Sequence, residues 1–282
     1  MLGLVLVYPS SVTATNIQLD MASLVDDLME KSDGIKTTIN LSGKQRMLTQ
    51  RMTKLALLIS LNINKDKNQK SLMAFANLYH DTLEGFKDKD NKEVDAQIVV
   101  IEKIWKPFFK NVKIVVEGKD KDGKALDYLI AKNGTLLKES NILVTNFEEG
   151  NKSQNYMEKA MVSIINLAGR QRMLTQKMTK EKLLCVKGKS ENSAKLDKTV
   201  KLFDDSLTTL IKGNTKQKIS KPTNKKIKAQ LAKVALIWKE LKPIYENKKP
   251  TVQELAVVIK KNSVLLKEMN IMVQLVETET EY

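Results

Sequence analysis

Histidine, cysteine, proline and aromatic residues are scarce in this sequence. The chain of 282 residues contains one His, one Cys and 5 Pro, and aromatic residues make up 5% of it. A single cysteine excludes an intrachain disulfide framework and a multi-cysteine metal site, and a single histidine excludes a histidine-cluster metal site. The few aromatic residues argue against a large β-sandwich and against base-stacking platforms. Because hydrophobic residues reach 42%, the chain is not a disordered, proline-rich linker.

The signatures of catalysis are also missing. The sequence contains no GxSxG motif, P-loop or dinucleotide-binding fingerprint. Carboxylate pairs such as Asp204-Asp205 are adjacent in sequence, so their side chains diverge by about 100° on a helix. The lone His80 has no counterpart in the second half of the chain. We therefore predict that the protein is not an enzyme and that it needs no cofactor and no metal.

Positive charge is abundant. The chain has 48 Lys and Arg against 33 Asp and Glu, a net charge of +15, which favours contact with anions or acidic surfaces. The lysines are spread along the chain, with the densest cluster at 221–228, whereas a nucleic-acid-binding protein concentrates them on one face. We expect no nucleic-acid partner. Weak adhesion to anionic lipid, pilus or cell-wall polymer stays open.

The chain begins with a short apolar segment. Residues 1–8 read MLGLVLVY, and the small residues Val12 and Ala14 fit the spacing of a signal-peptidase site, although the usual basic residues are missing. Interpreted as a truncated or atypical signal peptide, residues 1–14 predict export, which in a bacterium means the periplasm. A plain apolar tail is the alternative. No other stretch approaches the roughly 18 apolar residues of a membrane span.

The chain repeats itself at an interval of about 126 residues. Residues 39–59 read INLSGKQRMLTQRMTKLALLI, and residues 165–185 read INLAGRQRMLTQKMTKEKLLC. Weaker matches follow in the same order, at 104–106 and 237–239, which hold the two Trp, and at 133–142 and 262–271. We infer a tandem duplication with a first unit at 15–148 and a second at 149–282.

Each unit is predicted to form four helices, because apolar residues recur at helical spacing. The helices are expected at 16–62, 69–87, 92–117 and 124–148, and at 152–187, 193–212, 223–247 and 251–278. Pro107 and Pro243 fall late in the third helix of each unit and should kink or end it. The pattern predicts an all-α fold of two tandem up-down-up-down four-helix bundles. Whether the chain turns at 150–151 or continues there as one long helix stays open.

The repeated motif has two contrasting faces when it is placed on a helix. The apolar face is expected to meet the bundle core, and it consists of Leu41, Leu48, Met52, Leu55, Ile59, Leu167, Leu174, Met178 and Cys185. The opposite face carries Gly43 and Gly169. A glycine inside a helix costs about 0.5–1 kcal/mol relative to alanine, so another group is expected to approach the backbone closely there.

Arg46 and Arg172 lie one helical turn beyond these glycines. A guanidinium group offers five donors in a planar fork, which suits carboxylate, phosphate or a planar oxyanion. If the two faces meet across a pseudo-twofold axis, the arginines converge, and a bound anion would relieve their repulsion. Gln50 and Gln176 could add neutral hydrogen bonds. The alternative is that both arginines are solvated, as is expected of the motif's other basic residues Lys44, Arg51, Arg170 and Lys177.

The run NLAGRQRMLTQ at 166–176, with its copy at 40–50, resembles the signature of PilJ-type sensory domains. These domains lie on the extracytoplasmic side of type IV pilus-linked and nitrate-sensing chemoreceptors, and they are similar to the sensor domain of bacterial nitrate/nitrite histidine kinases. The resemblance implies a four-helix bundle whose first helix carries the motif. It also implies that nitrate binds between paired first helices, held by an arginine from each. By position these are Arg46 and Arg172, preceded by Gly43 and Gly169.

The chain departs from the family pattern in its architecture. Members are usually membrane receptors with two spans and a cytoplasmic output domain, and neither feature is expected here. We therefore expect an exported protein that binds nitrate or nitrite between its motif helices and signals through a membrane receptor or sensor. The halves could pair with each other or with a second copy of the chain. A helical scaffold that docks on a receptor or pilus component without a small ligand is the alternative.

Overall fold

The computed structural model describes residues 34–87, 91–150, 156–279 and 282, and these residues form eight α-helices, one short 3-10 helix and no strand. The all-α class predicted from the sequence is therefore confirmed. The predicted signal segment 1–14 lies outside the described residues, as do the first parts of the helices expected at 16–62 and 152–187. None of the described helices is both long enough and apolar enough to cross a membrane.

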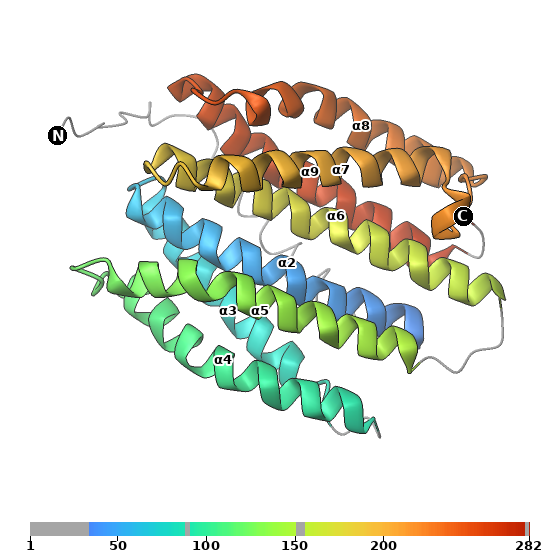
Figure 1. Ribbon diagram of the computed structural model, residues 1–282, viewed down its shortest axis with the longest axis horizontal. Coiled ribbons are helices and arrows are strands. Elements are labelled where there is room, and N and C mark those ends of the chain that lie inside the picture. Colours follow the sequence, from blue (N-terminus) through green and yellow to red (C-terminus); the bar gives the residue numbers. More distant parts are fainter. Residues whose placement is uncertain (1–33, 88–90, 151–155, 280–281) are drawn as a thin grey trace.

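The first half of the chain forms a bundle of four helices. They are α2 (Ile35–Ser60), α3 (Lys65–Glu84), α4 (Lys92–Val116) and α5 (Lys124–Glu149). α2 packs against α3 and α5, and α4 closes the bundle by packing against the same two helices. Successive helices run in opposite directions, as Figure 1 shows, which gives the up-down-up-down order.

The second half repeats this arrangement. Its helices are α6 (Tyr156–Val186), α7 (Asn192–Lys212), α8 (Lys225–Glu246) and α9 (Val252–Thr278), with the 3-10 helix η1 (Thr215–Gln217) between α7 and α8. α6 packs against α7 and α9, and α8 packs against the same pair. α5 and α6 are separate helices, so the structure does not join the halves through one continuous helix (Figure 1).

Neither proline of the third helices ends its helix. α4 continues from Pro107 to Val116, and α8 continues from Pro243 to Glu246. Proline removes one backbone hydrogen bond, but Trp105 and Phe108 on either side of Pro107 are fully packed in the bundle core. Tertiary packing therefore maintains the helix across a residue that would otherwise favour its end.

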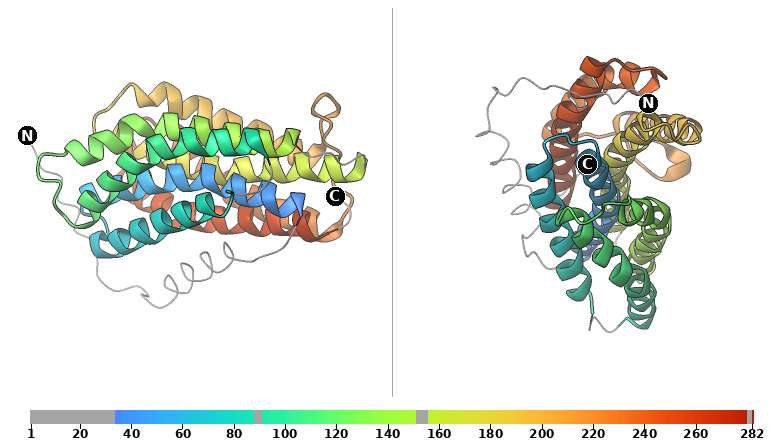
Figure 2. Two further views of the ribbon diagram at one scale, coloured as in Figure 1. Left: turned by 90° about the horizontal axis from the view of Figure 1, so that it is seen from below. Right: turned by 90° about the vertical axis from the view of Figure 1, so that its left-hand side faces the viewer.

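The motif helices α2 and α6 lie at the centre of the molecule. The contact between them is the most extensive between any two described helices, and Figure 2 shows them enclosed by the outer helices of both bundles. The apolar face of α2 meets its own bundle, with Leu48 and Met52 buried. Its opposite face is buried against α6, so the motif pair forms within one chain. Three residues expected in the core are only half-buried, namely Leu41, Leu167 and Cys185.

Candidate functional site

Arg46 of α2 and Arg172 of α6 converge in the interface between the two bundles. Each side chain is 1% exposed. A Cβ atom built on Gly43 would lie 3.2 Å from Arg46 Nη2 and 3.7 Å from Arg172 Nη2. One built on Gly169 would lie 3.4 Å from Arg172 Nη2 and 3.5 Å from Arg46 Nη2. Both guanidinium groups therefore reach the space that the two glycines leave free.

Arg46 donates hydrogen bonds to uncharged oxygen atoms. Its Nη1 donates to Asn141 Oδ1 of α5 at 3.2 Å, and its Nη2 donates to the main-chain oxygen of Asn166 of α6 at 3.3 Å. The first contact lies within its own bundle and the second crosses to the other bundle. Arg46 therefore connects three helices that belong to two repeat units.

Arg172 repeats this pattern with shorter hydrogen bonds. Its Nη1 donates to Asn270 Oδ1 of α9 at 2.8 Å. Its Nη2 donates across the interface to Asn40 of α2, to the main-chain oxygen at 3.3 Å and to Oδ1 at 2.8 Å. Arg172 thus makes one more contact than Arg46, and the two halves of the site are similar but not equivalent.

The positive charge of this site is poorly compensated. Among the described residues, no Asp or Glu forms an ion pair with Arg46 or Arg172, and the Nε atom of each is buried without a hydrogen-bond partner. Burial lowers the pKa of Arg46, and the charges of Arg170 and Arg172 lower it further, against the opposing effect of Glu148. Burial also lowers the pKa of Arg172. Two buried like charges with free donors favour the binding of an anion.

Two carboxylates accept hydrogen bonds from the asparagines that the arginines contact across the interface. Asn166 Nδ2 donates to Glu148 Oε2 at 2.8 Å, and Asn40 Nδ2 donates to Glu277 Oε2. Each asparagine thus stands between an arginine and a carboxylate. Burial raises the pKa of Glu148, because its charged form loses contact with water.

A second pair of buried cations lies about two helical turns further along the same helices. Lys54 of α2 is 5% exposed, and its Nζ donates to Asn262 Oδ1 at 2.9 Å. Lys180 of α6 is 9% exposed, and its Nζ donates to Asn133 Oδ1 at 2.6 Å and to Gln50 Oε1 at 2.8 Å. Burial lowers the pKa of both lysines, that of Lys180 to about 8. We call these residues the lysine layer.

The glutamines predicted to bind a ligand belong to this lysine layer. Gln50 accepts from Lys180, and Gln176 Nε2 donates to Asn262 Oδ1 at 3.0 Å. In the described part of the chain, no hydrogen bond joins either glutamine to Arg46 or Arg172. The arginines and glycines are thus brought together, while the glutamines lie with the lysines.

Two basic side chains expected in solvent are buried instead. Lys44 is 6% exposed, and Arg51 is 8% exposed, with its guanidinium carbon 4.2 Å from the centre of the Phe75 ring. The reason is that α2 is enclosed by its own bundle and by α6 on nearly every side. Arg170 and Lys177 are partly exposed.

Sequence reasoning missed the partners of the arginines and the lysine layer. Asn40 and Asn166 lie within the repeated motif, Asn141 and Asn270 within the repeated segment of the fourth helices, and Lys54 and Lys180 within the motif as well. The signal that could have found them is their identity in both copies. In addition, no group of three or more His, Cys, Asp or Glu among the described residues is placed to hold a metal ion.

Comparison with known proteins points to one family. The family model PilJ, described as the N-terminal domain of type IV pili methyl-accepting chemotaxis transducers, matches residues 28–128 and 156–260. Together these segments span more than half of the chain, one in each bundle, so the resemblance of the repeated motif to PilJ-type domains is confirmed. No curated protein and no solved structure matches the chain.

Proposed function

The chain belongs to the PilJ family of chemotaxis-transducer N-terminal domains, in two tandem copies, and from this premise we propose that it is a sensory protein that binds a small oxyanion between α2 and α6. The family is one of sensory and signalling domains and not of enzymes. The first candidates for the ligand are nitrate and nitrite. The observation that carries this proposal is the convergence of two buried arginines, Arg46 and Arg172, on the space between Gly43 and Gly169.

The donors of the site suit a small planar anion. A guanidinium group binds an oxyanion best through two parallel N–H groups. In both arginines Nε has no partner, and in Arg46 the neighbouring Nη2 makes only one long bond to a main-chain oxygen. Arg46 can therefore present its Nε–Nη2 edge to an anion, and Arg172 can present its Nε, because its Nη2 already donates twice to Asn40. A single negative charge between the two would reduce their repulsion, and the missing side chains of the glycines let both guanidinium groups come close to the helix backbones.

The same contacts suggest how binding is signalled. Arg46 and Arg172 each bond an asparagine of their own bundle and a residue of the other bundle. An anion that draws the two guanidinium groups together would thus alter the position of one bundle relative to the other. A membrane receptor or sensor that contacts both bundles would detect this change. We place the protein in the periplasm, on the basis of its family and the apolar segment 1–8.

The alternative is a helical scaffold without a small ligand. In such a protein, Arg46 and Arg172 would be exposed or would pair with carboxylates of their own bundle. Both arginines are buried, and both bond to amide and carbonyl oxygen atoms. These contacts favour the ligand-binding function.

Titration calorimetry of the chain with nitrate tests the proposal, with nitrite, chloride and sulfate as comparison anions. We expect saturable binding of one nitrate per chain. Nitrate at 100 times its dissociation constant should then raise the free energy of unfolding by about 2.7 kcal/mol, because it binds only the folded chain. If none of the four anions binds, the scaffold function replaces this proposal.

Alanine at Gly43 should weaken nitrate binding, because its methyl group would lie 3.2 Å from Arg46 Nη2 and 3.7 Å from Arg172 Nη2 and would occupy the proposed anion site. In the helix interior, alanine is favoured over glycine by about 0.5–1 kcal/mol, but the short contact with Arg46 should offset part of this gain in stability. Urea unfolding and calorimetry of Gly43→Ala measure the two effects.

Gly134→Ala is the matched control for this substitution. Gly134 is also inside a helix, but it is exposed, and a Cβ atom built on it would have no neighbouring atom within 4 Å. This variant should gain the full helix preference of alanine and bind nitrate as the wild type does. Unchanged nitrate affinity in Gly43→Ala would contradict the placement of the anion between the glycines.

A further inference from the structure

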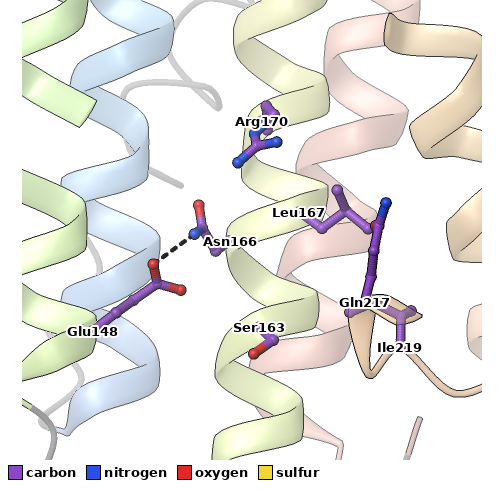
Figure 3. A pocket seen from close by; sticks show the side chains of 7 residues that line it. All are labelled: Glu148, Ser163, Asn166, Leu167, Arg170, Gln217 and Ile219. Atoms are coloured by element: carbon purple, nitrogen blue, oxygen red, sulfur yellow. Dashed lines mark hydrogen bonds between the residues drawn. The ribbon is translucent and has the colours of Figure 1, made fainter. Parts of the chain in front are cut away.

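A pocket of about 310 Å³ opens beside the arginine site on one side of the molecule. It lies where the end of α5, the first half of α6 and the loop around η1 meet (Figure 3). Its lining is mostly polar and consists of Glu148, Ser163, Asn166, Leu167, Arg170, Gln217 and Ile219.

The pocket is connected to Arg46 through Asn166. The side chain of Asn166 forms part of the lining, and its Nδ2 donates to Glu148 Oε2, as Figure 3 shows. The main-chain oxygen of the same residue accepts from Arg46 Nη2 at 3.3 Å. One residue therefore separates the pocket from the buried guanidinium group of Arg46.

The equivalent asparagine in the other copy is bonded differently. Asn40 Oδ1 accepts from Arg172 Nη2 at 2.8 Å, whereas Asn166 Oδ1 is buried and has no hydrogen-bond partner. Arg46 Nη2 therefore makes fewer and longer hydrogen bonds across the interface than Arg172 Nη2 does. Its long bond to Asn166 can be exchanged for a bond to an anion at little cost, so an anion that enters from the pocket meets the weaker of the two contacts.

The charges around the pocket also favour an anion. Arg170 is partly exposed in the lining and makes no hydrogen bond or ion pair with another described residue. The neighbouring loop carries exposed Lys216 and Lys218 beside Gln217. At the motif position of Arg170, the first copy has Lys44, which is buried. The second copy alone thus presents this cation to solvent.

We propose that this pocket is the port through which the anion reaches the Arg46–Arg172 pair, with Arg170 as its first contact and the Asn166–Glu148 pair as the gate. The inference rests on the proposed function. Arg170 attracts the anion from solvent and increases its local concentration. Glu148 repels it, and the hydrogen bond from Asn166 holds the carboxylate in the path. Arg46 then receives the anion in place of the oxygen of Asn166.

Association rates of nitrate test the port, and calorimetry measures the affinity separately. NMR line shapes of the full chain during a sodium nitrate titration give both rate constants. Arg170→Gln should slow association about tenfold at low salt, and the effect should shrink as sodium chloride is added. Lys44→Gln, the same change at the matched position of the first copy, should leave the association rate unchanged.

Glu148→Gln provides a second test with the opposite sign. It removes the repelling charge and keeps a side chain that can bond Asn166, so association should accelerate at least about threefold. Glu277→Gln, its counterpart in α9 of the second copy, removes the carboxylate bonded to Asn40 and should have no such effect. The port is contradicted if the wild type binds nitrate but Arg170→Gln or Glu148→Gln associates with it at the wild-type rate. It is also contradicted if each control variant changes the rate as much as its matched port variant does. In both cases the arginine site remains supported. If the wild type binds no nitrate, both proposals fail.

Discussion

Arg46→Gln should weaken nitrate binding by about a hundredfold or more without unfolding the chain. The substitution removes the Nε–Nη2 edge of one guanidinium group and with it two charge-assisted hydrogen bonds, each of about 1.5–3 kcal/mol. The glutamine amide can still donate to the oxygen atom of Asn141 that Arg46 contacts. Arg172→Gln should have a similar effect, because the anion needs both sides of the site. Calorimetry with nitrate measures the loss.

In the absence of nitrate, Arg46→Gln should not lower the stability of the protein, unlike most substitutions of a buried arginine. Removing a buried arginine normally destabilises a protein, because its charge partner is left unpaired. Arg46 has no such partner among the described residues, and it lies beside a second buried cation, Arg172. Without nitrate, the variant should therefore be as stable as the wild type or more stable in urea unfolding. Added nitrate should stabilise the wild type and leave the variant unchanged.

Arg51→Gln is the control for the loss of a buried arginine from the same helix. Arg51 is buried against the Phe75 ring of α3, a helix of the first bundle. This variant should keep its nitrate affinity. If Arg51→Gln loses binding as Arg46→Gln does, the cause is damage to α2 and not the loss of a ligand contact. If Arg46→Gln binds nitrate normally, the anion site lies elsewhere.

The repeat explains why much of this architecture can be predicted from one sequence. Because Arg46 and Arg172 occupy matching positions in two copies of one motif, they come together when the motif faces of the two copies meet across a pseudo-twofold axis. Helical periodicity predicts the class, and it places the six helix starts that can be compared within four residues of the observed ones, since each helix keeps one apolar face. The starts expected at residues 16 and 152 lie outside the described residues.

Burial of the motif helices could not be predicted from periodicity alone. The pattern of α2 shows one apolar face, and a helix of that kind in a single bundle exposes its other face. In the structure the second bundle covers that face, so Lys54 is buried although lysine is mostly found in solvent. Its hydrogen bond is accepted by Asn262 of α9, and Gln50 of α2 accepts in turn from Lys180 of α6. Only the pairing of the bundles determines these contacts.

The protein should become more stable as the pH rises above neutrality, because of the lysine layer. In the folded chain the pKa of Lys180 is about 8, against 10.5 for an ordinary lysine, and burial lowers that of Lys54 in the same direction. Between these values the unfolded chain binds more protons than the folded chain, so the free energy of unfolding rises with pH. The contribution of Lys180 should reach about 2 kcal/mol near pH 9.5 and about 3 kcal/mol once both states are neutral.

Urea unfolding of the wild type and of Lys180→Met between about pH 7.5 and 9.5 isolates this effect. At higher pH the ionisation of tyrosine would also change the free energy of unfolding. Burial raises the pKa of Tyr245 to about 12 in the folded chain, so this residue ionises first in the unfolded chain and the change would oppose that of the lysines. The contribution of Lys180 should disappear in Lys180→Met, where that of Lys54 remains, and the full rise should persist in Lys201→Met, which removes an exposed lysine. An equal rise in all three proteins would mean that Lys180 stays protonated in the folded chain throughout this range. The lysine layer would then be a permanently charged part of the interface, like the arginine pair beside it.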